Sequence, residues 1–189
     1  MMWRITSVFI VLSLLFVACE DENYIPKPST YFKLNFPERV YKNYQDTCGF
    51  SFTIPSYFEV VDKKDQRNPC NRDINFKGLN GTLFLSYIPM ETELYRYIDY
   101  SLSKVDEHKI KASFIKDTTL LYPEHGVYGT YFFLGGDVAK PIQFYLTDSS
   151  DIFMSGYVMF NAVPSYDSIK PVLNFVEEDI LKMLESTKF

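Results

Sequence analysis

The chain has few of the residues on which metal binding usually depends: two histidines and three cysteines among 189 residues. A structural zinc site needs four ligands, almost always Cys or His, at characteristic spacing. Neither His108 nor His125 belongs to a His-Glu-x-x-His motif or to a Cys/His cluster. We therefore expect no metal site, and we expect both histidines to have surface or capping roles.

Motifs of nucleophilic and phosphate chemistry are missing too. No Gly-x-Ser-x-Gly elbow surrounds a serine, and Gly78-Leu79-Asn80-Gly81 lacks the Lys-Ser/Thr of a phosphate loop, so it predicts a turn. We expect no catalytic residues and no cofactor, and we expect that the protein is not an enzyme.

An excess of basic residues is also missing. Lys and Arg total 19 against 24 Asp and Glu, which gives a net charge of -5. A protein that binds nucleic acid normally carries a basic excess, so no nucleic-acid partner is expected. Aromatic residues make up 17% of the chain, which is far more than disordered sequences contain. The composition predicts an ordinary folded protein.

No hydrophobic run is long enough for a spanning helix, which needs roughly 20 residues. The apolar run at 5–18 follows Arg4 and ends before acidic residues, and this pattern predicts a signal peptide over residues 1–18. Phe16-Val17-Ala18-Cys19 resembles a bacterial lipobox, in which the Cys receives acyl chains such as palmitate; Phe16 replaces the usual Leu. The alternatives are a secretory signal with an incidental Cys19, or an uncleaved anchor.

The segment after the signal contains Pro26 and Pro28 and predicts a lipidated N-terminus and tether over residues 19–30. The remaining residues, 31–189, are expected to form a single domain. Cys48 and Cys70 are then the two leftover cysteines of an exported domain, and pairing in a structural disulfide is the favoured interpretation. Two free buried thiols are the alternative.

Hydrophobic periodicity predicts an α+β fold: an antiparallel β-sheet with packed helices. The expected strands are 49–55 with 57–61 as its partner, 82–88 in the middle of the sheet, and a meander of 127–134, 142–147 and 152–160; the expected helices are 94–105 and 169–184. This order looks like the PsbP/Mog1-type α/β/α sandwich.

Three smaller patterns have structural and functional interpretations. Asp148 and Asp151 are expected in a hairpin turn rather than a calcium loop. Asp167-Ser168 is expected to cap the last helix, and it also fits a Bacteroidota O-glycosylation pattern. Seven tyrosines exceed what a small core can hide, so several rings are expected at the surface, where they favour protein contacts. They are Tyr95, Tyr97, Tyr100, Tyr128, Tyr131, Tyr145 and Tyr157.

Nearly the whole chain resembles the gliding-motility lipoprotein D (GldD) family of Bacteroidota. The segments that carry the resemblance are the lipobox ending at Cys19, Tyr24-Ile25-Pro26-Lys27-Pro28, Tyr31-Phe32 through Phe36-Pro37, Cys48 before Phe50-Ser51-Phe52-Thr53-Ile54-Pro55, Cys70, Gly81-Thr82-Leu83-Phe84-Leu85-Ser86-Tyr87, Val127-Tyr128-Gly129, Gln143-Phe144-Tyr145-Leu146-Thr147-Asp148-Ser149 and Phe160-Asn161.

That resemblance implies a lipid-anchored envelope protein required for gliding motility and for type IX protein secretion. Its partners would be the membrane, reached through the anchor, and other proteins of that machinery. The expected location is the outer membrane, facing the periplasm. A ligand-binding module for a glycan or small molecule is the alternative.

Overall fold

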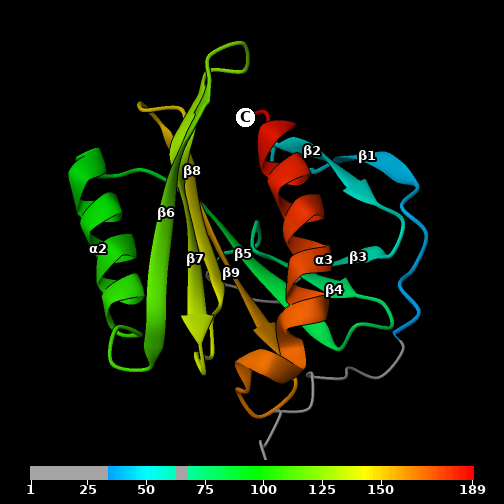
Figure 1. The fold of residues 1–189 in the computed structure, drawn as a ribbon. Helices are drawn as coiled ribbons and strands as arrows, with labels where there is room; N and C mark the ends of the chain where they lie inside the picture. The colour runs from blue at the N-terminus through cyan, green and yellow to red at the C-terminus, as the bar shows by residue number, and fades with distance from the viewer. Residues whose placement is uncertain (1–33, 63–67) are drawn as a thin grey trace, which may run out of the picture. The chain divides into compact units, whose positions relative to one another are not determined.

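The computed structural model describes residues 34–62 and 68–189, and a large antiparallel sheet lies at its centre (Figure 1). The predicted signal peptide, the predicted lipidation site Cys19 and the predicted tether over residues 19–30 lie outside the described residues. The strands are β1 (Tyr41–Gln45), β2 (Ser51–Pro55), β3 (Phe58–Asp62), β4 (Arg72–Phe76), β5 (Gly81–Pro89), β6 (Ala112–Tyr122), β7 (Val127–Gly136), β8 (Ile142–Thr147) and β9 (Ile152–Phe160), and the helices are α2 (Leu94–Asp106) and α3 (Tyr166–Glu185).

Seven of these strands form one sheet in the order β3-β4-β5-β9-β8-β7-β6, and β1 and β2 form a separate two-stranded sheet. β5 lies in the interior and pairs with β9 along its whole length, from Gly81 opposite Phe160 to Pro89 opposite Ile152. Every pairing in the larger sheet is antiparallel. Neither described helix is long and apolar enough to span a membrane.

The two helices lie on opposite faces of the larger sheet. Successive side chains on a strand point to opposite faces, and on β7 Phe133 belongs to the main core whereas Phe132 belongs to a second cluster. The main core contains Leu173 and Ile180 of α3, and the second cluster contains Val105 of α2. The arrangement is therefore helix, sheet, helix, as Figure 1 shows.

The α+β class, both helices, the interior position of β5 and the β7-β8-β9 meander are confirmed. The likeness to the PsbP/Mog1 sandwich stays a prediction. The expected pairing of 49–55 with 57–61 is wrong, because β2 pairs with β1 and β3 pairs with β4. Strands β4 and β6 were not expected.

The start of α3 also differs from the expectation. Ser165 is the N-cap residue, so Asp167 and Ser168 already lie in the first turn. Pro171 therefore lies inside the helix. Proline has no backbone N–H, so the helix lacks one hydrogen-bond donor at this position. The helix continues because Ile169 and Leu173, on either side of Pro171, are buried.

Candidate functional site

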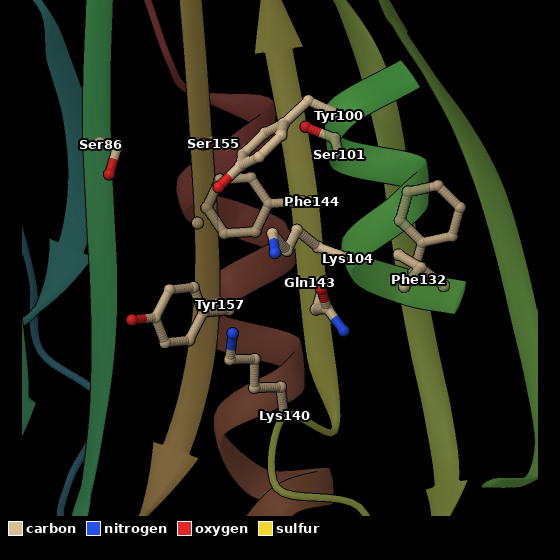
Figure 2. Close-up of a pocket in the computed structure, with 12 residues that line it drawn as sticks. Ser86, Tyr100, Ser101, Lys104, Phe132, Lys140, Gln143, Phe144, Ser155 and Tyr157 are labelled. Atoms are coloured by element: carbon tan, nitrogen blue, oxygen red, sulfur yellow. The ribbon is translucent and has the colours of Figure 1, made fainter. Parts of the chain in front are cut away.

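The described residues contain a cavity of about 350 Å³ between α2 and the sheet (Figure 2). Its lining comes from β5, β7, β8, β9, α2 and the connection between β7 and β8. The polar and aromatic residues in this lining include Ser86, Ser101, Ser155, Lys104, Lys140, Gln143, Tyr100 and Tyr157.

Small side chains in the middle of the helix–sheet contact create this cavity. At one end α2 rests on the sheet through Tyr97, whose ring lies 5.5 Å from that of Phe153. At the other end Val105 packs into the second cluster. Between these supports the floor is Ser86 and Ser155, which are register partners on β5 and β9, so no bulky group fills the space.

Two lysines give the cavity a positive character. Lys104 of α2 donates to Glu107 Oε1 at 2.6 Å, and this hydrogen bond lowers the pKa of the Glu107 carboxyl. Lys140 Nζ lies 4.2 Å from the centre of the Tyr157 ring, and within the described residues it has no ion pair. Figure 2 shows both ammonium groups directed into the same space. Among the described residues, Lys140 therefore has no carboxylate within ion-pair distance, whereas Lys104 is paired with Glu107.

Neutral hydrogen-bonding groups surround these charges. Gln143 is only 6% exposed, and its Nε2 has no hydrogen-bond partner in the described part of the chain. No described residue accepts a hydrogen bond from Ser86, Ser101 or Ser155. A buried amide without a partner costs free energy. The cavity thus offers charged and neutral donors beside the aromatic rings of Tyr100 and Tyr157.

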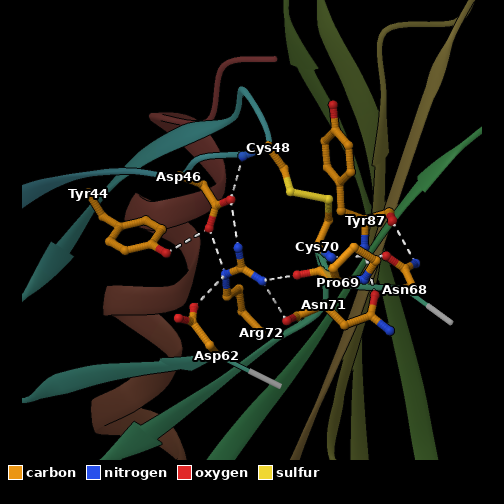
Figure 3. The surroundings of a disulfide bond; sticks show 10 residues. All are labelled: Tyr44, Asp46, Cys48, Asp62, Asn68, Pro69, Cys70, Asn71, Arg72 and Tyr87. Atoms are coloured by element: carbon orange, nitrogen blue, oxygen red, sulfur yellow. Dashed lines mark hydrogen bonds and ion pairs between the residues drawn. A yellow bond between two sulfur atoms is a disulfide. The ribbon is translucent and has the colours of Figure 1, made fainter. Parts of the chain in front are cut away.

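A second polar cluster surrounds the disulfide between Cys48 and Cys70, whose Cα atoms are 5.9 Å apart (Figure 3). Arg72 is 4% exposed and donates to both carboxylate oxygens of Asp46, at 2.7 and 2.9 Å. Tyr44 donates to the same carboxylate at 2.7 Å, and so does the backbone N–H of Cys48, at 2.8 Å. With every oxygen of the buried carboxylate occupied, this cluster serves structure.

A third cluster surrounds Asp179, a fully buried carboxylate on α3. Arg39 Nε donates to it at 3.1 Å, and the hydroxyls of Tyr41 and Tyr57 also donate to it. These donors come from the chain before β1, from β1 and from the turn before β3. Asp179 therefore ties the N-terminal part of the described chain to the last helix.

The family profile described as "Gliding motility lipoprotein GldD" matches residues 21–189, which is almost the whole chain. The chain belongs to the GldD family of gliding motility lipoproteins. No curated protein matches it in a sequence comparison. Membership in a lipoprotein family indicates an envelope protein held at a membrane by lipid.

The structure separates the two histidines of this GldD-family chain. His108 follows α2, and its backbone N–H donates to the Val105 carbonyl. His125 lies in the β6–β7 turn. Burial lowers the pKa of His108, and the charge of Lys140 lowers it further. Among residues 34–62 and 68–189 no three Cys, His, Asp or Glu side chains come together as metal ligands do.

The smaller patterns mostly have structural roles. Asp148 Oδ1 accepts the backbone N–H groups of Ser150, Asp151 and Ile152, so it shapes the β8–β9 turn. Asn80 adopts a φ of 52°, which Asn tolerates in a turn. Exposed tyrosines are confirmed: Tyr95 and Tyr100 are 62% and 64% exposed.

The cavity was not predicted from the sequence, because Lys104 and Lys140 do not belong to any recognisable sequence motif.

Alkaline pH is expected to destabilise the domain through three buried or partly buried tyrosines, Tyr41, Tyr57 and Tyr131. Burial and the hydrogen bond to Asp179 raise the pKa of Tyr41 to about 12 and also raise the pKa of Tyr57; burial and Glu177 raise the pKa of Tyr131. The unfolded chain loses these protons near pH 10, so stability is complete below pH 10 and falls as pH rises toward 12.

The loss is at most about 1.4 kcal/mol per pH unit for each tyrosine. Urea unfolding at pH 8, 10 and 11 measures it, and Tyr131→Phe should reduce the slope between pH 10 and 11. Equal stability at pH 8 and pH 11 would contradict the assignment.

Proposed function

We propose that this GldD-family protein is a non-catalytic accessory lipoprotein of gliding motility and of type IX secretion in Bacteroidota. The observation that carries the proposal is the match of the GldD profile to residues 21–189. A role as assembly component fits a domain whose buried polar clusters, around Asp46 and Asp179, are each fully engaged in holding chain segments together.

Cys19 is assigned as the anchor residue, which carries palmitate or similar acyl chains. The domain is assigned to the periplasm, at the outer membrane. Each acyl methylene buried in a bilayer contributes about 0.8 kcal/mol, and two or more chains give lasting attachment. A net charge of -5 gives the protein no electrostatic attraction to anionic lipid, so attachment depends on the acyl chains.

Contacts with partner proteins are assigned to exposed apolar and aromatic side chains. Tyr95 on α2 is 62% exposed, and Leu121 on β6, opposite Tyr128 on β7, is 64% exposed. Tyrosine is enriched where proteins meet, because its ring adds contact area and its hydroxyl can bond. The surfaces of α2 and of the β6–β7 hairpin are the places where such contacts are expected.

The test is a clean deletion of the gene, complemented with wild type, Cys19→Ala or, as the control, Ser29→Ala. Wild type and Ser29→Ala should restore both colony spreading and protein secretion. Cys19→Ala should restore neither, although immunoblots of envelope fractions show the protein. Normal spreading and secretion in the deletion strain would refute the proposal.

A ligand-binding module is the second candidate, and the cavity beneath α2 favours it. Its volume of about 350 Å³ lies within the usual range of small-molecule sites. The two functions are compatible, because the cavity lies on a different part of α2 from Tyr95.

A further inference from the structure

We propose that the cavity beneath α2 binds an anionic sugar, a saccharide that carries a carboxylate or a phosphate. The proposal goes beyond the accessory role and stands whether or not the protein acts in secretion. It rests on the charges of the cavity, its unpaired donors, its aromatic walls and its size.

The charges select an anion. Lys104 and Lys140 reach the cavity from separate elements, and Glu107 is the one carboxylate within ion-pair distance of either lysine among the described residues. Lys104 is paired with Glu107, so the ammonium group without an ion pair among the described residues is that of Lys140, on a chain whose net charge is -5. An anionic group between the two ammonium groups would form charge-assisted hydrogen bonds with both.

The unpaired donors indicate a ligand with hydroxyl or carbonyl oxygens. Gln143 Nε2 is buried and has no partner among the described residues, and the serine hydroxyls of β5, β9 and α2 face the same space. Buried polar groups in folded proteins are almost always hydrogen-bonded. Sugar hydroxyls can both donate and accept, so one saccharide ring satisfies several of these groups together.

The walls and the size fit a sugar ring. Tyr157 stacks on Phe84 at 5.1 Å, and the ring of Tyr100 lies at the rim (Figure 2). The Tyr157 ring already holds Phe84 and the Lys140 ammonium, so Tyr100 offers the aromatic face that packs against the apolar C–H face of a pyranose ring. A volume of about 350 Å³ accommodates one or two rings, not a polysaccharide segment.

Binding is tested by NMR titration and calorimetry of the full-length chain in detergent. The probes are glucuronic acid for a carboxylate, glucose 6-phosphate for a phosphate, and glucose as the neutral analogue. At least one anionic probe should bind and shift resonances of α2, β8 and β9, and glucose should bind far more weakly. The stronger anionic probe distinguishes the two classes of charged group.

Substitutions place the ligand in the cavity. Lys104→Ala and Lys140→Ala should each weaken binding by about 10- to 100-fold, the usual effect of losing one charged hydrogen bond. Ser101→Leu should abolish binding by filling the space and leave both lysines in place. Lys109→Ala is the matched control: it removes the same charge from an exposed residue outside the cavity and should leave binding unchanged.

Two outcomes would overturn the proposal. One is that neither anionic probe binds the folded wild-type chain at millimolar concentration. The other is that Lys109→Ala weakens binding as much as Lys140→Ala does, since binding would then follow overall charge rather than the cavity. Circular dichroism of each variant confirms that the domain is folded, and Ser101→Leu provides a test that does not depend on removing a lysine.

Discussion

Replacing Asp179 with alanine is expected to lower the free energy of unfolding by about 3–5 kcal/mol, the usual effect of breaking a buried ionic pair. Asp179 is completely buried and accepts hydrogen bonds from Arg39, Tyr41 and Tyr57. Without the carboxylate, the hydroxyl of Tyr57, a residue that is only 4% exposed, has no acceptor. An unsatisfied buried donor and an unpaired cation both destabilise the folded state.

Glu178 provides a closely matched control. It is the neighbour of Asp179 on α3 and also contacts Arg39, at 2.6 Å, but its side chain is 69% exposed. Exposed ion pairs contribute about 0–1 kcal/mol, so Glu178→Ala should lower the free energy of unfolding by less than about 1 kcal/mol. Urea unfolding of both variants measures the difference. If Asp179→Ala were within 1 kcal/mol of wild type, the carboxylate would not hold the N-terminal segment.

Local periodicity was sufficient to predict the helices and the meander. On α3 the buried positions Ile169, Leu173, Val176 and Ile180 follow the 3.6-residue repeat, and they all face the core. The links between β7, β8 and β9 are short, which leaves antiparallel pairing as the simple solution. These elements were predictable because their signals lie within a few residues of one another.

Long-range partners explain what the sequence did not predict. β2 follows β1 and precedes β3, and nothing local decides which of the two it pairs with. The contacts of Arg39, Tyr41 and Tyr57 with Asp179 connect residues more than a hundred positions apart, and they hold β1 in place beside β2. β6 is an edge strand with mostly exposed residues, so it lacks the alternation that marks a strand.

The cavity could not be predicted either, because it also depends on contacts between residues far apart in the sequence. Ser86 and Ser155 are ordinary strand residues in the sequence, and they form a floor only because β5 pairs with β9 in this register. A shift of one residue would place other side chains beneath α2. Lys140 lies in the loop between β7 and β8, and its distance in sequence from Lys104 matches no known motif. The site depends on tertiary structure, which single-sequence patterns do not contain.

Replacing Cys48 and Cys70 together with serine is expected to lower the free energy of unfolding by about 3 kcal/mol, because the bridge restricts the unfolded chain. The two cysteines are 22 positions apart, so the bond closes a loop of intermediate length. Urea unfolding with and without reductant measures the effect. Reductant should destabilise wild type and leave the double-serine variant unchanged. Equal stability of wild type and variant without reductant would contradict the prediction.

The bridge should also strengthen the buried pair beside it. Asp46 and Arg72 each lie two residues from one of the cysteines, so the bridge holds their backbones close before the pair forms. Arg72→Met should therefore cost more in the disulfide-bonded protein than in the double-serine variant. A double-mutant cycle measures this coupling, which for groups in direct contact is about 0.5–3 kcal/mol. A coupling of zero would show that the pair orders itself without the bridge, and the bridge would then act on the unfolded chain alone.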